Sequence, residues 1–338
     1  MIEVEDLTKY YSGRSAISGL TFRIEKGEIV GFLGLNGAGK TTTLRILACL
    51  TLPSSGRVRI DGLDAETDAH EIRRRLGFLP DAPPLYEEMS VSSYLRFVAE
   101  LKGLSRREAA MRVEEVIDTC RLNEAREQLI GTLSHGFRQR TGIAQAVVHR
   151  PSLLILDEPT GGLDPVQIVE MRELIKRLGG EHTILLSSHI LSEISQTCDR
   201  LLIIHEGRII ADGTEAAICQ RMSQDQDAGI LELEVEGPEG ISAAETGERA
   251  RSVVGKVQGV LTSRVVGQRG RRVQLEVEFN TDRRPAVARA IVESGLGLVR
   301  LDRRAMELEA VFQRLTQGSR AGFLPSTAAQ RNQAEVKA

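Results

Sequence analysis

The segment 34–41 constrains this chain most, because its sequence GLNGAGKT matches the spacing G-x-x-x-x-G-K-[ST]. It follows the nearly all-apolar run 29–33, which is typical of a strand covered on both faces, and helical periodicity begins at Lys40. Glycines at these positions let backbone N–H groups point inward around a phosphate chain. Lys40 adds a positive charge, and Thr41 offers a hydroxyl to Mg²⁺. The segment therefore predicts a nucleoside-phosphate site at the start of a helix.

Two acids end a second apolar run, LLILDE at 153–158. At the carboxyl end of a strand, Asp157 is suited to hold Mg²⁺ through water. Glu158 follows directly and can orient the attacking water or accept a proton from it. A pair of solvated acids at a strand end is the alternative, and it becomes the weaker one downstream of a phosphate-binding loop.

A third segment, LSHGFRQR at 133–140, precedes a helix that we expect to reach about residue 148. Ser134 and Gly136 lie at the start of that helix, where exposed N–H groups and the helix dipole favour an anion. For this segment taken by itself, the preferred interpretation is that Ser134 is only an N-cap and Gly136 only a turn residue.

The order of predicted elements indicates two domains in the 338 residues. Strands and helices alternate over 153–204, which predicts a parallel sheet with helices on its faces. No strand-like run occurs in 90–130, so we expect a helical subdomain over about 85–150 within a first domain at 1–216. The first domain is thus of the α/β class.

The composition changes near residue 220, and a polar linker is expected at 217–228. The order β-α-β-β-α-β over most of 229–317 predicts a small α+β domain of ferredoxin-like type. A further helix is expected at 306–315, and residues 318–338 are polar and small, which is typical of a disordered tail.

The composition also argues against several functions. The net charge is −3 and there is no Trp, so binding of nucleic acid through bulk charge or base stacking is not expected. No run of about 18 apolar residues could span a membrane. Four scattered cysteines without a CxxC pair are typical of free thiols in a reducing cytoplasm.

The three segments occur together with GLDP at 162–165 and with His189, in the order found in the ATP-binding cassette of ABC transporters. The chain resembles this family over about 1–216. The resemblance implies a P-loop NTPase fold, with a mixed sheet and a helical subdomain.

The resemblance also implies a role for individual residues. Glu158 corresponds to the catalytic acid and His189 to the switch histidine that contacts the γ-phosphate. Ser134 and Gly136 correspond to the signature that meets the ATP held by a partner chain. Mg²⁺ ligands would be Thr41, Asp157 and Asp81. The implied nucleotide-binding residues are Tyr11 (or its neighbour Tyr10) for adenine, and Asn36, Gly37, Ala38, Gly39, Lys40, Thr41 and Thr42 for the phosphates.

The chain departs from the family pattern at four positions. Leu35 stands where the family commonly has Pro, and Asp81 stands where many members have Gln and export cassettes often have Glu. Asp is shorter by one methylene, which reduces its reach. His135 replaces the first Gly of the signature pair, and Phe137 replaces its Gln, an aromatic that is similar to the signature of export cassettes.

The resemblance therefore implies an ATPase that uses ATP and Mg²⁺ and forms a homodimer through its cassettes. It would power export by a separate integral membrane permease, as a peripheral protein on the cytoplasmic face of the membrane. A non-transport ABC-type ATPase that acts on a soluble or nucleic-acid complex is the alternative. For the C-terminal domain, a sensor, a docking module and a brace of the dimer remain open.

Overall fold

The computed structural model describes residues 1–224, 229–281, 283–304 and 312. The chain divides into two compact units, one formed by Met1–Glu215 and a second that begins at Ala216. The predicted helix at 306–315, apart from residue 312, and the predicted tail at 318–338 lie outside the described residues.

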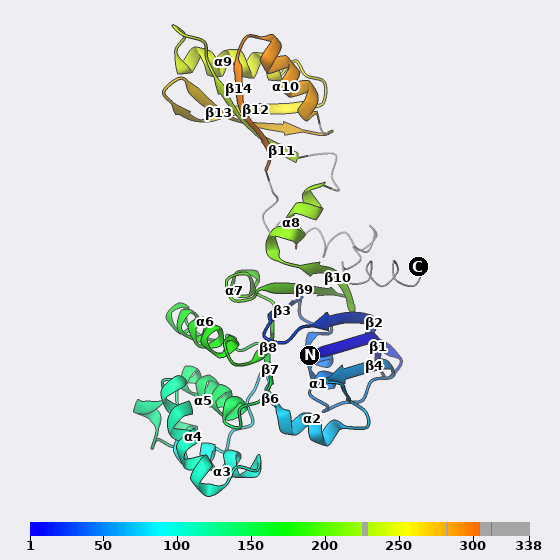
Figure 1. The fold of residues 1–338 in the computed structure, drawn as a ribbon, viewed down its shortest axis with the longest axis vertical. Helices are drawn as coiled ribbons and strands as arrows, with labels where there is room; N and C mark the ends of the chain where they lie inside the picture. Colours follow the sequence, from blue (N-terminus) through cyan, green and yellow to red (C-terminus); the bar gives the residue numbers. More distant parts are fainter. Residues whose placement is uncertain (225–228, 282, 305–311, 313–338) are drawn as a thin grey trace. The chain divides into compact units, whose positions relative to one another are not determined.

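A six-stranded mixed sheet forms the centre of the first unit (Figure 1). Its order is β10-β9-β3-β8-β7-β6, and all neighbours are parallel except β10 and β9. Every residue of β3 and β7 is buried, as the apolar runs that precede the phosphate-loop segment and Glu158 predict. The strands are β3 (Ile29–Leu33), β6 (Leu76–Leu79), β7 (Leu153–Asp157), β8 (Thr183–Ser188), β9 (Arg200–His205) and β10 (Arg208–Gly213).

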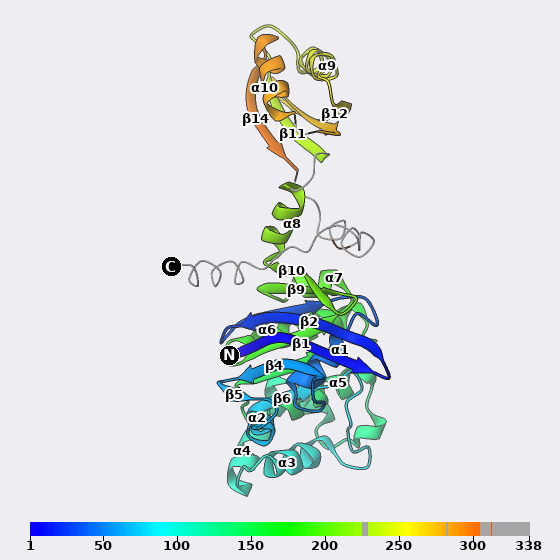
Figure 2. The same cartoon turned by 90° about the vertical axis from the view of Figure 1, so that its right-hand side faces the viewer.

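A second, antiparallel sheet in the order β2-β1-β4-β5 lies beside it, and Figure 2 shows β1, β2 and β4 next to one another. Apolar residues of these strands share one buried core with helix α1 and with β3 and β7 of the central sheet. The elements are β1 (Ile2–Tyr11), β2 (Arg14–Ile24), α1 (Lys40–Leu47), β4 (Ser55–Ile60), β5 (Leu63–Asp64) and α2 (Ala69–Arg75).

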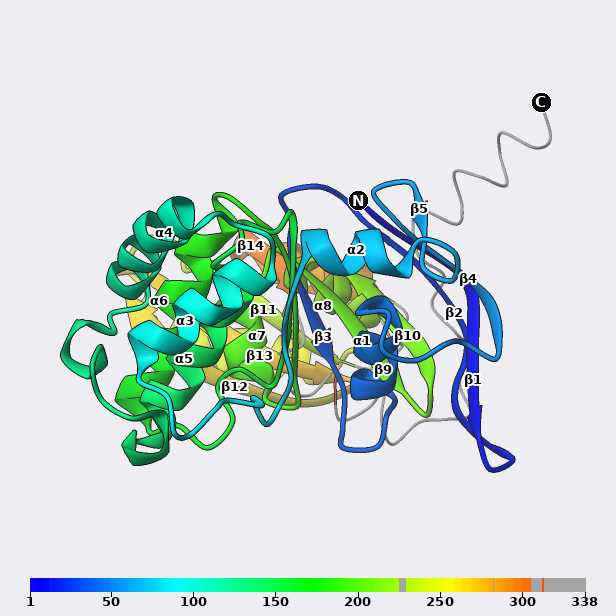
Figure 3. The same ribbon diagram turned by 90° about the horizontal axis from the view of Figure 1, so that it is seen from below.

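The remaining helices cover the other face of the central sheet, and Figure 3 shows α5 and α6 across β3 from α1. Serines begin three of the helices: Ser90, Ser105 and Ser134 each accept a backbone N–H at an N-terminus. The elements are α3 (Val91–Leu101), α4 (Arg106–Thr119), η1 (Asn123–Ala125), η2 (Ile130–Thr132), α5 (His135–Val147), α6 (Pro165–Gly179) and α7 (Leu191–Ser195). The predicted P-loop NTPase fold with a helical subdomain is confirmed.

Helix α8 (Glu215–Gln224) occupies the first part of the stretch 217–228, so the prediction of a linker is wrong there. The stretch is polar, but Gln220 and Arg221 are good helix formers, and Ile218 and Cys219 are buried. Residues 225–228 lie outside the described ranges.

The second unit contains a four-stranded antiparallel sheet in the order β12-β13-β11-β14. Two helices pack on one face of this sheet and share its buried apolar side chains, which agrees with the predicted β-α-β-β-α-β order. The opposite face carries charged side chains such as Glu234 and Arg272, which form an ion pair. The elements are β11 (Gly229–Glu236), α9 (Ala243–Val254), β12 (Val260–Arg269), β13 (Arg272–Phe279), α10 (Arg284–Glu293) and β14 (Gly297–Arg303).

Candidate active site

The phosphate-loop segment connects β3 to α1, and two of its glycines show why the loop has this shape. Gly39 has φ +108°, and a Cβ there would lie 2.6 Å from Ile17 Cγ2 and 2.8 Å from the carbonyl oxygen of Ala16. Gly37 has φ +82°, a region that other residues rarely adopt. As the N-cap of α1, Gly39 brings no side chain that could accept from the first N–H groups of the helix. These donors are therefore left for an anion.

Lys40 is only 6% exposed, although it carries a charge. Its Nζ donates to the carbonyl oxygen of Gly34 at 2.7 Å. The same nitrogen lies 3.3 Å from Oε1 of Glu158. The side chain is thus held within the loop with its ammonium group toward the end of β7.

Glu158 joins three elements at the edge of the sheet. Its backbone has φ +49°, and its N–H donates to Oγ of Ser187 in β8 at 3.1 Å. Its Oε2 lies 2.9 Å from Nδ1 of His189, which donates to it. The carboxylate therefore lies between the ammonium of Lys40 and the imidazole of His189.

Asp157 is almost completely buried, with 1% of its surface exposed. Ser187 Oγ donates to its Oδ1 at 2.6 Å. Burial raises the pKa of Asp157, while hydrogen bonds with Ser187 and with Thr41 act in the opposite direction. A carboxylate beside a threonine hydroxyl is an all-oxygen donor set, which fits Mg²⁺.

Most of the predicted nucleotide residues line one pocket of about 330 Å³. Ala38 is buried behind the loop, and its carbonyl oxygen accepts from the N–H of Gly207. Asp81 is exposed and lines the same pocket, where a Cβ on Gly161 would lie 3.9 Å from its Oδ1. The pocket is lined by Ala16, Leu35, Asn36, Gly37, Gly39, Lys40, Thr41, Thr42, Asp81, Glu158, Gly161 and His189.

Five of the predicted residues do not line this pocket: Tyr11, Ala38, Ser134, Gly136 and Asp157. Ser134 and Gly136 line a different cavity of about 480 Å³, together with Phe137 and Gln167. Ser134 is the N-cap of α5 and accepts from the N–H of Phe137 at 3.4 Å. Tyr11 is 45% exposed at the end of β1, where Nζ of Lys9 lies 5.2 Å from the centre of its ring.

Sequence reasoning missed a buried network behind Glu158 and His189. Oε2 of Glu193 in α7 accepts from Thr160 Oγ1 at 2.5 Å and from Ser188 Oγ at 3.1 Å. Ser187 also went unnoticed, although two serines at the end of an apolar run were a signal for hydrogen bonds at the strand end. No local pattern marks Glu193, because its burial depends on the packing of α7 against the sheet.

Comparisons with known proteins agree with this architecture. A family model described as ABC transporter matches residues 17–161. The bacitracin transport ATP-binding protein BcrA of Bacillus licheniformis is 43% identical over 214 residues, which cover 63% of this chain and 69% of that protein. The chain belongs to the ABC transporter ATP-binding proteins. The uncharacterised member YcbN of Bacillus subtilis is 31% identical over 321 residues, 94% of this chain and 98% of that one.

Other members support the same assignment of this ABC ATPase. The linearmycin resistance ATP-binding protein LnrL of Bacillus subtilis is 34% identical and aligns over 70% of this chain and 76% of its own length. A solved ATP-binding subunit of an ABC transporter superposes with a TM-score of 0.61 at 34% identity, covering 66% of this chain and 93% of that one. The dimeric cassette MJ0796 with ADP and Pi gives 0.59 at 25% identity, covering 63% of this chain and 98% of that one.

This ABC ATPase is thus an ATP-binding and ATP-hydrolysing subunit of an ABC transporter. The prediction of a transporter subunit is confirmed, and the alternative of a non-transport ATPase is not supported. Among the residues that the structure describes, no helix combines the length and the apolar character needed to cross a membrane.

Proposed function

We propose that this ABC ATPase powers export by a separate integral membrane permease, to which it binds on the cytoplasmic face of the membrane. The observation that carries the proposal is the gathering of Lys40, Glu158 and His189 around one pocket with the phosphate loop. The relatives that are named for bacitracin transport and linearmycin resistance support export of a substance harmful to the cell.

Each of these side chains has a step in the reaction. The N–H groups at the start of α1 and the ammonium of Lys40 bind the β- and γ-phosphates of ATP. On ATP binding, the ammonium of Lys40 leaves the carboxylate of Glu158 and contacts the phosphates. The carboxylate of Glu158 then orients the attacking water and accepts its proton. His189, 2.9 Å from Glu158, holds the carboxylate from the other side and would contact the γ-phosphate.

Thr41 and Asp157 would hold Mg²⁺, with Asp81, which lines the same pocket as Thr41, as a third candidate. The ion, when bound, neutralises charge on the phosphates. Around it, Ser187 keeps one oxygen of Asp157 in place at 2.6 Å, and its hydroxyl also receives the N–H of Glu158. Ser187 thereby fixes the spacing of the two acids.

A second copy of this chain completes each ATP site. Ser134 and Gly136 line a cavity of their own, which supports contact with an ATP that another subunit holds. Their position at the start of α5 gives them N–H donors suited to phosphate. Two nucleotides would then lie in a two-fold interface between the cassettes. Tyr11 or the neighbouring Tyr10, both exposed at the end of β1, would stack on adenine.

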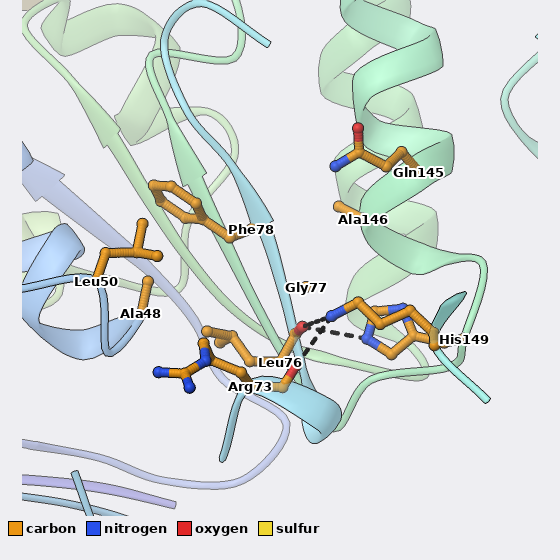
Figure 4. Close-up of a pocket in the computed structure, with 10 residues that line it drawn as sticks. Ala48, Leu50, Arg73, Leu76, Gly77, Phe78, Gln145, Ala146 and His149 are labelled. Carbon is orange, nitrogen blue, oxygen red and sulfur yellow. Dashed lines mark hydrogen bonds between the residues drawn. The ribbon is translucent and has the colours of Figure 1, made fainter. Parts of the chain in front are cut away.

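The permease is proposed to bind at the groove between the central sheet and the helical subdomain. Figure 4 shows this pocket of about 200 Å³, in which residues after α1, from β6 and from α5 face one another. Leu50 is 57% exposed at its rim. Lys102 Nζ donates to the carbonyl oxygens of Arg73 and Leu76 inside it. A cytoplasmic loop of the permease with an apolar side chain and an acidic group fits this lining.

Purification of the tagged chain from membranes tests the transport function. We expect an integral membrane protein to co-purify with the wild type, and Leu50→Glu to reduce its recovery at least tenfold while ATP hydrolysis by the purified chain stays unchanged. Met111→Glu, a change at another exposed apolar residue, serves as the control. Recovery of nucleic acid in place of a membrane protein would contradict the proposal.

The variant Glu158→Gln tests the chemical step. The amide keeps the size of the side chain but cannot accept a proton, so we expect ATP to bind, the dimer to persist and kcat to fall by a factor of at least about 100. Phosphate release and size-exclusion chromatography with ATP measure the two effects. Glu88→Gln, an exposed acid, is the control. A wild-type kcat in Glu158→Gln would refute the role of Glu158.

A further inference from the structure

His135 connects the signature segment to the loop that follows Glu158. It is the first residue of α5, and its side chain is exposed. Its Nε2 lies 2.8 Å from the carbonyl oxygen of Gly161 and donates to it. The side chain thus bridges two segments that are 26 residues apart in sequence.

Gly161 links His135 to the backbone of the catalytic residue Glu158. Its N–H donates to the carbonyl oxygen of Glu158 at 3.0 Å, which closes a tight turn. Glu158 itself has φ +49°, a left-handed conformation that is uncommon and costly for a non-glycine residue. Gly161 also lines the ATP pocket. A continuous chain of hydrogen bonds therefore runs from His135 through Gly161 to the backbone of Glu158.

The surrounding packing is built for this close approach. Gly162 has φ +71°, and a Cβ at that position would lie 3.1 Å from Nε2 of His135. A Cβ on Gly136 would lie 2.9 Å from the side-chain oxygen of Gln167 in α6. Gly162 thus lets the turn after Glu158 approach His135, and Gly136 lets the start of α5 approach α6.

We propose that His135 is a positioning residue for Glu158 in its own chain. It holds the turn that keeps the Glu158 backbone in its strained conformation, and it ties that turn to the helix start that carries Ser134 and Gly136. The inference rests on the proposed role of Glu158 as the base. It adds a function for a residue at which this chain departs from the glycine of the family pattern.

Steady-state ATP hydrolysis by the full chain tests the inference. Because His135 is exposed, its replacement leaves the fold intact, and equal melting temperatures check this. We expect His135→Ala to lower kcat about fivefold, the factor of one lost neutral hydrogen bond, with KM for ATP within twofold of wild type. In His135→Gln, the side-chain amide can still donate to the carbonyl oxygen of Gly161, so we expect kcat to lie within twofold of wild type. His70→Ala, at an exposed histidine in α2, is the control.

Dimers of two different variants show whether His135 acts on Glu158 of its own subunit or on the site of the partner subunit. One subunit carries Glu158→Gln, so that only the other subunit hydrolyses ATP. We expect His135→Ala to slow hydrolysis when it is in the active subunit, and to have less effect in the inactive one. Equal slowing from both placements would overturn the inference, as would a wild-type kcat in His135→Ala or a His135→Gln variant as slow as the alanine. A wild-type rate in Glu158→Gln would instead overturn the proposed function together with it.

Discussion

At the scale of single residues, the site places opposite charges side by side, since Nζ of Lys40 lies 3.3 Å from Oε1 of Glu158. Glu158 lies between Lys40 and His189, while Asp157 beside it is buried with only hydroxyl donors. The first carboxylate contacts the ammonium of Lys40 and the ring of His189, whereas the second is buried and accepts from the hydroxyl of Ser187. Such an arrangement lowers the stability of the fold and provides a site that suits a charged ligand.

The variant Asp157→Asn makes this cost measurable. Burial raises the pKa of Asp157 above its value in the unfolded chain, so the ionised carboxylate destabilises the fold. This loss of stability begins as the pH rises through the unfolded-state pKa and is complete once the pH exceeds the raised folded-state pKa. The amide cannot ionise and can still accept from Ser187. We expect the nucleotide-free variant to melt a few degrees higher than wild type at neutral pH.

Thermal unfolding over a pH series checks this, together with ATP hydrolysis, which the variant should lose. The difference in melting temperature should shrink as the pH falls and the wild-type carboxyl becomes protonated. A variant that melts below wild type at neutral pH would show that the carboxylate contributes more by its contacts than it loses by burial.

At the scale of elements, the site depends on strand ends that are joined by short buried contacts. The carboxyl ends of β3, β7 and β8 meet at one edge of the sheet because these strands are parallel neighbours. Helix α7 secures this edge, since Glu193 accepts from Thr160 after β7 and from Ser188 at the end of β8. Glu158 directly follows β7 and His189 directly follows β8, so these contacts of Glu193 also fix Glu158 and His189 relative to one another.

Replacing Glu193 tests this connection between elements. Glu193→Ala leaves the buried hydroxyls of Thr160 and Ser188 without their acceptor, so we expect a loss of about 1–3 kcal/mol in the free energy of unfolding. Glu193→Gln keeps an acceptor oxygen and should lose less. Denaturant unfolding measures both variants, and equal stability of Glu193→Ala and wild type would contradict the structural role.

At the scale of the whole molecule, the pocket that we propose to bind ATP is lined by residues of the first unit alone. All residues that line it lie between Ala16 and His189, and the second unit has a buried core of its own. None of the residues that line this pocket comes from the second unit. Its charged sheet face, with pairs such as Glu234 and Arg272, favours polar contacts over the burial of an apolar partner.

A chain that ends at Gln220 tests whether the second unit is needed for catalysis. We expect it to fold, to bind ATP and to hydrolyse it within about threefold of the full chain, because the pocket and the core around α1 remain complete. Circular dichroism and phosphate release are the measurements. Loss of dimerisation with ATP in this shorter chain would show that the second unit braces the dimer.

Local patterns in the sequence determined the fold class, the phosphate loop and the acids after β7, because apolar runs, glycine spacing and helix starts act over a few residues. The prediction of a linker was wrong for the part of 217–228 that lies in α8, where Ile218 and Cys219 are buried by packing that the local sequence does not show. Only the tertiary structure decided that Glu193 and His135 contact the loops around Glu158. Their partners lie 5 to 33 residues away in sequence, and that proximity comes from the packing of helices on a sheet.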